Sequence, residues 1–347
     1  DARGPGPKGN GYMTGKVLVC GGAGYIGSHM VRLLGETGFE VVVFDNLSQG
    51  HAAAIPGVPL EQGDLLDRAA LDAVFAAHDF DAVYHFAALI AVGESVSQPD
   101  RYYRNNLLGT LNLLDAMRTA GVDRFVFSST AAVYGNPVTD RIAESHTKAP
   151  ISPYGRSKWM MEQVLADYAR AFGMRAVSFR YFNAAGADPS GGIGEAHDPE
   201  THLIPNVLLA ALGERDALDV FGDDYETRDG TCIRDYIHVR DIASAHLRAL
   251  DWMEANAGTH AFNLGNGAGF TTREVLDAAA KVTGREIPFR IGPRREGDPA
   301  VLVADSSAAK RELGWTPEFV ELDAILASAW AWHAAPGYGP FARNGKR

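Results

Sequence analysis

The chain has 347 residues, of which 46% are hydrophobic and 22% are charged, as in an ordinary globular protein. Its formal net charge of −11 argues against a nucleic acid or an anionic membrane as the main partner, because either would require a basic surface. No apolar run approaches the roughly 18 residues that a membrane-spanning helix needs.

The two cysteines indicate the cellular compartment of the protein, and the first 12 residues indicate which part of the chain belongs to the fold. Cys20 and Cys232 form neither a disulfide framework nor a metal cluster, and they suit a reducing compartment, so we expect a cytoplasmic protein. Residues 1–12 are rich in Gly and Pro and lack an apolar segment. We interpret them as an expression-vector remnant, with Met13 as the natural start, and leave them out of the fold prediction.

From Lys16 onward, short apolar runs alternate with segments of helical spacing. The runs predict strands at 16–20, 40–46, 81–88, 124–130 and 174–183. The helical segments are 28–38, 65–78, 101–121 and a helix that starts near 153. This alternation predicts an α/β fold, a Rossmann-type doubly wound parallel sheet with helices on both faces.

The regular alternation of predicted strands and helices ends after Asn183. A long segment rich in Gly, Pro and acidic residues is followed by short elements without a regular strand–helix rhythm. We therefore expect a dinucleotide-binding domain over 13–183 and a smaller α/β lobe over 184–347, with the chain crossing back to the main sheet near 235–265.

A glycine-rich loop follows the first predicted strand. The sequence GGAGYIG fits G-x-G-x-x-G from Gly22, and Gly21, Gly24 and Gly27 also fit G-x-x-G-x-x-G. Such glycines allow a tight turn and a close approach of the backbone to a pyrophosphate, and the helix N-terminus then offers free N–H groups to the anion. A buried strand before the loop and a helix after it predict dinucleotide binding.

Two acidic residues refine this prediction. Asp45 ends the second strand, where a carboxylate accepts hydrogen bonds from the ribose hydroxyls and repels a 2′-phosphate, so NAD is favoured over NADP. Asp64 follows another predicted strand. It either hydrogen-bonds the adenine or caps a helix, and the two interpretations are compatible.

The segment SPYGRSK contains the candidate residues for proton transfer. Ser152 and Pro153 mark a helix start, and Tyr154 and Lys158, four residues apart, share one helix face. A lysine cation would favour the phenolate and lower the pKa of Tyr154, which could then take a proton from a sugar hydroxyl. Thr130, at the end of the strand FSST, would hydrogen-bond the same oxygen.

These motifs together resemble the extended short-chain dehydrogenase/reductase family, and within it the UDP-glucose 4-epimerases. The resemblance runs from about Lys16 to Tyr338 and rests on GGAGYIGSH, FDNLSQG, AVGES, YYRNN, FSSTAAVYG, SPYGRSK, RYFNAAGA, HLIPNV, FGDDYETRDGTCIRDYIHV, NLGNG and PRREGDPA. It implies a retained NAD that takes hydride from C4 of the hexose while Tyr154 takes the O4 proton. The 4-keto sugar then turns over, and hydride returns to its other face, so that UDP-galactose and UDP-glucose interconvert.

The resemblance also implies the site residues. The catalytic residues are Tyr154, Lys158 and Thr130. Cofactor-binding residues, with Tyr154 and Lys158 among them, are Gly21, Gly24, Tyr25, Ile26, Gly27, Asp45, Asn46, Asp64, Leu65, Phe86, Ala87, Asn105, Ser128 and Tyr181. Residues that hold the UDP-sugar, the expected partner molecule, are Thr130, Asn183, His202, Leu203, Arg234, Arg295 and Asp298. Arginines suit a diphosphate because their planar donors pair with phosphate oxygens.

Three positions depart from the family pattern. Ile90 stands where some members carry a lysine that adds positive charge near the cofactor. His202 stands where some have Asn, and it either bonds a phosphate or plays a structural part. Leu302 lines the sugar's 2-substituent and is intermediate in size, so UDP-N-acetylhexosamines stay open as substrates, as does UDP-xylose.

Two other functions, those of a dehydratase and of a non-enzymatic NAD sensor, fit the sequence less well. A 4,6-dehydratase usually needs Asp-Glu after the active-site Thr, whereas Ala131 and Ala132 follow it here. A non-enzymatic NAD sensor would be marked by loss of Tyr154 or Lys158, and both are present.

We expect no metal, because His29, His85, His238 and His246 show no ligand spacing. By resemblance we expect a homodimer through helices within 99–120 and 152–172.

Overall fold

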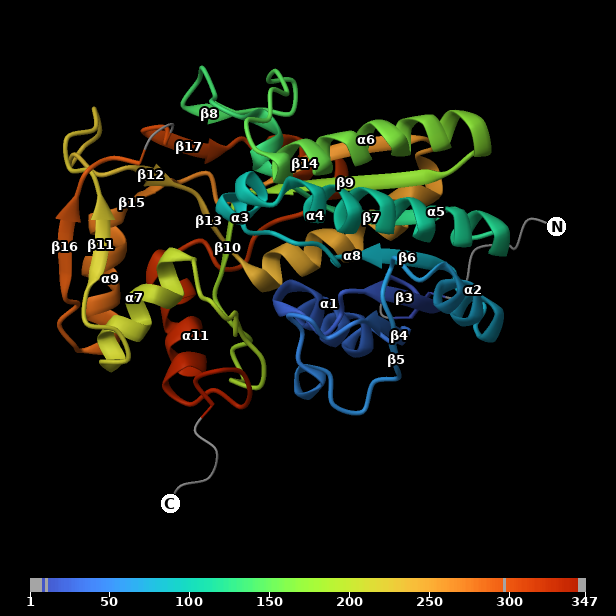
Figure 1. Cartoon of the computed structure of the whole chain (residues 1–347), viewed down its shortest axis with the longest axis horizontal. Coiled ribbons are helices and arrows are strands. Elements are labelled where there is room, and N and C mark those ends of the chain that lie inside the picture. Colours follow the sequence, from blue (N-terminus) through green and yellow to red (C-terminus); the bar gives the residue numbers. More distant parts are fainter. Residues whose placement is uncertain (1–7, 10–11, 296–297, 343–347) are drawn as a thin grey trace.

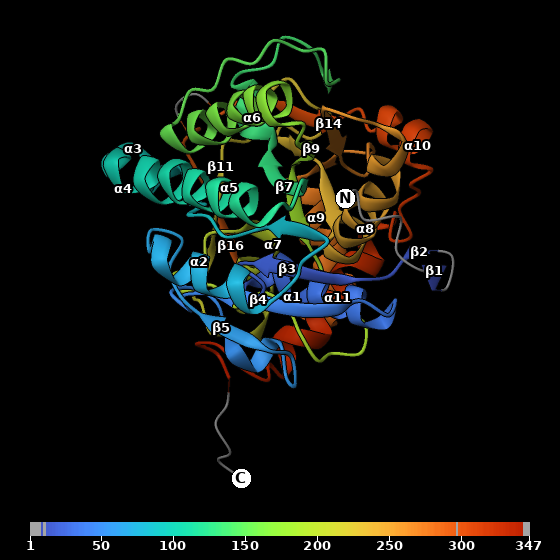
Figure 2. The same cartoon turned by 90° about the vertical axis from the view of Figure 1, so that its right-hand side faces the viewer.

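A computed structural model describes residues 8–9, 12–295 and 298–342. Its main sheet has seven parallel strands in the order β14-β9-β7-β6-β3-β4-β5. Their bounds are Lys16–Cys20 (β3), Glu40–Asp45 (β4), Leu60–Gln62 (β5), Ala82–His85 (β6), Arg124–Thr130 (β7), Arg175–Tyr181 (β9) and Thr259–Leu264 (β14). Figure 2 shows this sheet between two layers of helices. The predicted doubly wound fold is confirmed.

The alternation of side chains along β3 explains the two layers. Val17 and Val19 point into one apolar core with helices α1 (Tyr25–Glu36) and α8 (Val239–Ala255). Leu18 and Cys20 point into the other core, against the remaining sheet-covering helices. These helices are α2 (Arg68–Ala77), α5 (Gly109–Ala120) and α6 (Pro153–Phe172). A strand buried on both faces needs apolar residues at every position, which is why the strand sequences read as continuous apolar runs.

The predicted helix over 101–121 is interrupted. It divides into α4 (Pro99–Tyr102), a π-helical turn η2 (Tyr103–Leu108) and α5, with α3 (Val92–Ser97) just before it. A π-turn carries one residue more per hydrogen-bonded turn, and such turns occur frequently at functional sites. The expected start of α6 is confirmed, since the hydroxyl of Ser152 accepts a hydrogen bond from the amide of Gly155, 3.1 Å away.

The second half of the chain builds the smaller lobe, on the left of Figure 1. Its sheets are β10-β13, β11-β16 and the four-stranded β15-β12-β17-β8. The strands are Arg141–Ile142 (β8), Asn183–Ala185 (β10), Leu218–Phe221 (β11), Ile233–Arg234 (β12), Tyr236–His238 (β13), Phe270–Thr271 (β15), Phe289–Gly292 (β16) and Val301–Ala304 (β17). The helices are Leu203–Leu212 (α7), Thr272–Thr283 (α9) and Leu322–Ala334 (α11). Between these elements the chain returns to the main domain with α8 and β14, and again with α10 (Ser307–Leu313), whose Ala309 and Leu313 belong to the apolar core that contains α1.

Short elements complete the fold. They are two 3-10 turns, Ala52–Ala54 (η1) and Ala131–Tyr134 (η3), and the strands Lys8–Gly9 (β1) and Tyr12–Met13 (β2), which pair antiparallel. The rest of the expected N-terminal remnant, residues 1–7 and 10–11, lies outside the described residues. None of the described helices is long and apolar enough to cross a membrane.

Candidate active site

The glycine loop between β3 and α1 admits no larger residue at two positions. Gly21 has a φ of 77°, and a Cβ there would lie 2.4 Å from the amide nitrogen of Ala87. A Cβ on Gly27 would lie 2.0 Å from the carbonyl oxygen of Gly21. Gly24 is the N-cap and provides no side-chain oxygen for the first turn of α1. The positive end of the helix is therefore left to an external anion, which fits a pyrophosphate.

Asp45 lies where β4 ends, directly beside this loop. Its Oδ2 accepts a hydrogen bond of 3.0 Å from the amide of Ala23, and its Oδ1 accepts one of 2.8 Å from Leu47. The side chain is 8% exposed, and burial raises its pKa, while the two amides oppose that shift. A nearly buried carboxylate suits ribose hydroxyls and repels a phosphate, so this site fits NAD.

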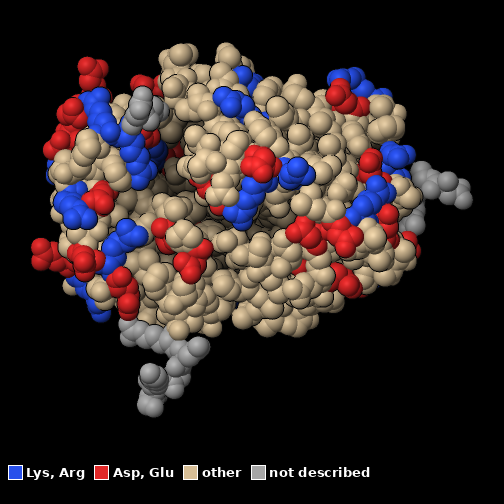
Figure 3. Space-filling model, in the orientation of Figure 1, with Lys and Arg blue, Asp and Glu red and all other residues tan. Residues whose placement is uncertain are grey.

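A cleft runs along the carboxyl ends of the strands. Its walls include nine of the predicted cofactor-binding residues, namely Gly21, Gly24, Asp45, Asn46, Asp64, Leu65, Phe86, Ala87 and Asn105. Figure 3 shows one face of the molecule, on which Lys and Arg are interspersed with Asp and Glu and which is hollowed near its centre.

Asp64 is not a helix cap, so that part of the prediction is wrong. The N-cap of α2 is Asp67, whose side chain accepts from the amide of Ala70. Asp64 instead accepts from the Asn46 amide group at 2.9 Å and from the backbone of Leu66 at 2.8 Å. The turn between β5 and α2 is three residues longer than the sequence pattern indicated. Asp64 thus remains on the wall of the cleft.

Two predicted cofactor residues in the loop face away from the cleft. The Tyr25 hydroxyl donates a hydrogen bond of 2.6 Å to the carbonyl oxygen of Gly186, and so joins α1 to the segment after β10. Ile26 packs against the apolar core between α1 and the sheet. Their side chains support the loop, so any contact with a cofactor would come from their backbone.

Lys158 is buried beneath the end of β7. It is 3% exposed, and its Nζ donates a hydrogen bond of 2.7 Å to the carbonyl oxygen of Ser128. The ammonium also lies 4.8 Å from the centre of the Phe127 ring. Burial lowers the pKa of Lys158 to about 7, and the carboxylate of Glu162 opposes this. A lysine that titrates near neutral pH in an apolar wall is typical of an active site.

Tyr154 lies beside Thr130, with which its hydroxyl forms a hydrogen bond. Burial raises the pKa of Tyr154, and the bond to Thr130 only partly opposes that rise. The expected lowering by Lys158 is therefore not seen in the protein alone, because the Lys158 ammonium is directed at a backbone carbonyl. Tyr181, opposite Thr130 in the sheet register, is hydrogen-bonded to the hydroxyl of Ser128.

Apart from Thr130 on β7, the predicted substrate residues come from the smaller lobe. Asn183 donates to the carbonyl oxygen of Asp235 at 2.9 Å. Arg234 forms an ion pair with Asp298, and Arg295 lies over the ring of Phe221, 3.8 Å from its centre. These four residues and the start of α7, where His202 is the N-cap and Leu203 the first residue, belong to one lobe. Asp298 joins Arg234 across 64 positions of sequence, a pairing that the sequence did not indicate.

Leu302 lies at the junction of the two parts of the molecule. It is opposite Arg234 in the register of β12 and β17. It also packs against Val133 and Tyr134, which follow β7. This position is compatible with a residue that lines the sugar. Ile90 also departs from the family pattern with an apolar residue, and it is 43% exposed.

Two groups of supporting residues were missed in the sequence. Glu162 and Arg180 form a buried ion pair behind β7, and the Ser129 hydroxyl donates to the same carboxylate at 2.5 Å. The helical spacing of Glu162 to Lys158 could have indicated a shared face. Asn106 is 2% exposed and bonds both the amide and the carbonyl of Leu89.

Known proteins resemble this chain over most of its length. The model of the "NAD dependent epimerase/dehydratase family" matches residues 17–265. The chain is 54% identical to the UDP-glucose 4-epimerase of Rhizobium meliloti (strain 1021), over 94% of this chain and 99% of that one. A structure of UDP-glucose 4-epimerase from Brucella ovis in complex with NAD is similar, with a TM-score of 0.89, 49% identity, and coverage of 91% and 97%. So is one from Bifidobacterium longum in complex with NAD⁺ and UDP, with a TM-score of 0.87, 41% identity, and coverage of 92% and 98%.

Proposed function

The chain belongs to the NAD dependent epimerase/dehydratase family, and on this premise we propose that it interconverts UDP-galactose and UDP-glucose. The reaction would be a reversible epimerisation at C4 through a 4-keto sugar, with a retained NAD. One observation carries the proposal. Tyr154, Thr130 and Lys158 converge at the end of β7, beside a cleft built for a dinucleotide.

We assign the cofactor to the cleft along the strand ends. Gly21, Gly24 and Gly27 allow the pyrophosphate to approach the start of α1, and Asp45 holds the adenosine ribose. Asn46, Asp64, Leu65, Phe86, Ala87 and Asn105 line the remaining wall. Ser128, Lys158 and Tyr181 are assigned to the nicotinamide end. NAD, when bound, supplies a reversible hydride acceptor and, in its oxidised form, a positive charge.

The chain's own residues manage the proton. Tyr154 takes the proton of the sugar O4 at its phenolic oxygen and later returns it, and Thr130 hydrogen-bonds the same oxygen. Because burial raises the pKa of Tyr154, the phenolate needs a positive charge nearby. Lys158, with a pKa of about 7, can supply it when protonated.

We assign the nucleotide sugar to the smaller lobe, residues 184–347, and the cofactor to 13–183. Arg234 and Arg295 would bind the diphosphate, and Asp298 keeps the Arg234 guanidinium in place. Asn183, His202 and Leu203 complete the proposed pocket. Leu302 is intermediate in size, so a UDP-N-acetylhexosamine is the second candidate substrate, and UDP-xylose follows it. Ala131 and Ala132 lack the groups that a dehydratase requires.

We further propose that the protein is a cytoplasmic homodimer. Both described cysteines are free, which suits a reducing compartment. The helices of 99–120 and 153–172 carry large exposed apolar side chains, with Leu108 44%, Met160 42% and Phe172 56% exposed. A four-helix contact with a second copy would cover them. Light scattering at micromolar concentration tests this, and a monomer would contradict the dimer.

The test of the function is incubation with UDP-galactose without added NAD, followed by chromatographic separation of the products. Formation of UDP-glucose, and its loss in Tyr154→Phe, is the expected result and also indicates a retained cofactor. Absence of product even with NAD supplied would overturn the assigned substrate. UDP-N-acetylgalactosamine and UDP-xylose would then be assayed in the same way.

A further inference from the structure

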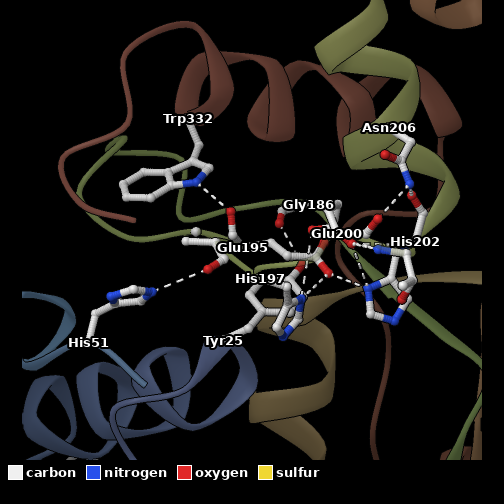
Figure 4. Close-up of polar contacts among 12 residues, drawn as sticks. Tyr25, His51, Gly186, Glu195, His197, Glu200, His202, Asn206 and Trp332 are labelled. Carbon is white, nitrogen blue, oxygen red and sulfur yellow. Dashed lines mark hydrogen bonds and ion pairs between the residues drawn. The ribbon is translucent and has the colours of Figure 1, made fainter. Parts of the chain in front are cut away.

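Four potential metal ligands gather in the segment between β10 and α7. They are Glu195, His197, Glu200 and His202, and one ligand atom from each lies within 4.8 Å of the others. Figure 4 shows the side chains of His197, Glu200 and His202 directed toward one another beside Glu195. Their spacing in the sequence, E-x-H-x-x-E-x-H, packs all four into eight residues.

The ligand atoms of this cluster are spaced close to the edges of a tetrahedral zinc site, with three of the pairs shorter than an edge and one longer. Zinc bonds of 2.0–2.2 Å to nitrogen and oxygen require ligand atoms about 3.3 to 3.6 Å apart. His197 Nδ1 lies 3.0 Å from a carboxylate oxygen of Glu195 and 3.7 Å from one of Glu200. His202 Nδ1 lies 3.2 Å from Glu200 and 2.6 Å from Glu195. Small movements would therefore bring all four atoms around one ion.

Burial and charge also favour a cation here. The side chains of Glu195 and Glu200 are only 3% and 4% exposed, and each carboxylate lies against the rings of His197 and His202. A buried charge is costly unless it is paired or coordinates a metal, so each carboxylate needs either a protonated imidazole or a metal ion. His202 Nδ1 is buried and has no hydrogen-bond partner although an oxygen lies 2.6 Å away, because the two groups are not aligned for a hydrogen bond.

The surroundings show what an ion would hold together. The carbonyl oxygen of Glu195 accepts a hydrogen bond of 2.8 Å from the indole of Trp332 on α11. The ring of His197 stands edge-on to that of Tyr25, at the start of α1, with centres 6.2 Å apart. His202 is the N-cap of α7. The segment 195–202 thus touches the dinucleotide-binding loop and two helices of the smaller lobe.

We propose that Glu195, His197, Glu200 and His202 bind one Zn²⁺ ion, which fixes the 195–202 segment between the glycine-loop helix and the smaller lobe. Two carboxylates and two neutral imidazoles balance the charge of the ion, and this mixed nitrogen and oxygen set suits zinc better than calcium or magnesium, which take oxygen ligands. The site is structural, since four protein ligands leave no position open for a reacting group. The Nε2 atom of His202 stays available to the proposed substrate.

This proposal departs from our expectation of a metal-free protein. That expectation rested on the spacing of four other histidines and did not weigh the pattern of 195–202. The proposal does not depend on the assigned reaction, because its test measures metal content and metal binding and not turnover. A failure of either can therefore be recognised separately.

The test uses the full chain purified without a polyhistidine tag. Zinc content is measured by elemental analysis after dialysis, and the stripped protein is then titrated with Co²⁺, whose tetrahedral complexes absorb strongly in the visible range. We expect about one zinc per chain and a tetrahedral Co²⁺ spectrum that Zn²⁺ displaces. His197→Gln should lose the bound metal and weaken Co²⁺ binding by more than about 100-fold, since loss of an outer-shell partner alone costs 10- to 100-fold.

His78→Gln is the matched control. His78 also lies near a carboxylate, 3.4 Å from Glu61, but among the described residues no third potential ligand joins this pair. This variant should retain zinc and the cobalt spectrum. The proposal is overturned if the wild-type protein contains no zinc and gives no cobalt spectrum, or if both variants bind metal equally. If His197→Gln does not fold, the wild-type protein must show a rise in melting temperature on return of Zn²⁺ after chelation, and no rise would equally reject the site.

Discussion

The buried ion pair behind the catalytic strand gives the sharpest stability prediction. Glu162 and Arg180 have side-chain exposures of 6% and 4%. One carboxylate oxygen of Glu162 accepts from Arg180 Nε at 3.0 Å, and Arg180 also donates to the Tyr134 hydroxyl at 2.9 Å. Glu162→Gln keeps the volume but removes the negative charge, so the guanidinium is left buried without its counter-charge. Breaking such a pair costs about 3–5 kcal/mol.

The matched control is a surface pair. Lys281 and Asp323 have side-chain exposures of 73% and 45%. Asp323→Asn should cost less than about 1 kcal/mol, because water screens exposed ion pairs. Both variants are unfolded in urea with far-ultraviolet circular dichroism as the signal, in the same excess of NAD. The free energy of unfolding is obtained by linear extrapolation.

A double variant separates the charge from the packing. Glu162→Leu with Arg180→Met replaces both partners by apolar groups of similar length, and such replacements are often neutral or stabilising. We therefore expect the double variant to be more stable than Glu162→Gln alone. The reasoning is refuted if Glu162→Gln costs no more than Asp323→Asn, or if the double variant is the least stable of the three.

Three further predictions concern the site. Tyr154→Phe should lower kcat by about 10²- to 10⁴-fold with NAD still bound, measured by turnover and cofactor absorbance; normal turnover would exclude Tyr154 as the proton carrier. Gly27→Ala should abolish NAD retention, because the new Cβ would lie 2.0 Å from the Gly21 carbonyl oxygen, whereas Gly35→Ala, with nothing within 4 Å, should retain it. The folded-state pKa of Lys158, about 7, lies below the usual value, so the unfolded chain binds more protons between pH 7 and 10. The free energy of unfolding of the cofactor-free protein should thus rise over that range by at most about 1.4 kcal/mol per pH unit relative to that of Lys158→Met. Urea unfolding at pH 7 and pH 9 tests this, and an equal difference between the two proteins at both pH values would contradict it.

The sequence by itself determined the main architecture and the centre of the site. Apolar runs such as 16–20 and 124–130 can only be buried strands, and the glycine loop, the Ser152 cap and the Tyr154–Lys158 spacing are local patterns. Local patterns depend on backbone conformation and on side chains a few residues apart. They can therefore be recognised from the sequence alone, and all of these elements were found where the sequence predicted them.

Only the tertiary structure decided contacts between residues far apart in the chain. Asp64 was open to two interpretations until its partner, Asn46, was known. The pKa of Tyr154 depends on how deeply it is buried, and burial is a property of the assembled fold. The cluster around Glu195 needed the same information, since its spacing acquires meaning only when four side chains turn toward one point. Burial and convergence arise from packing, which is why the chemistry of this site was completed in three dimensions.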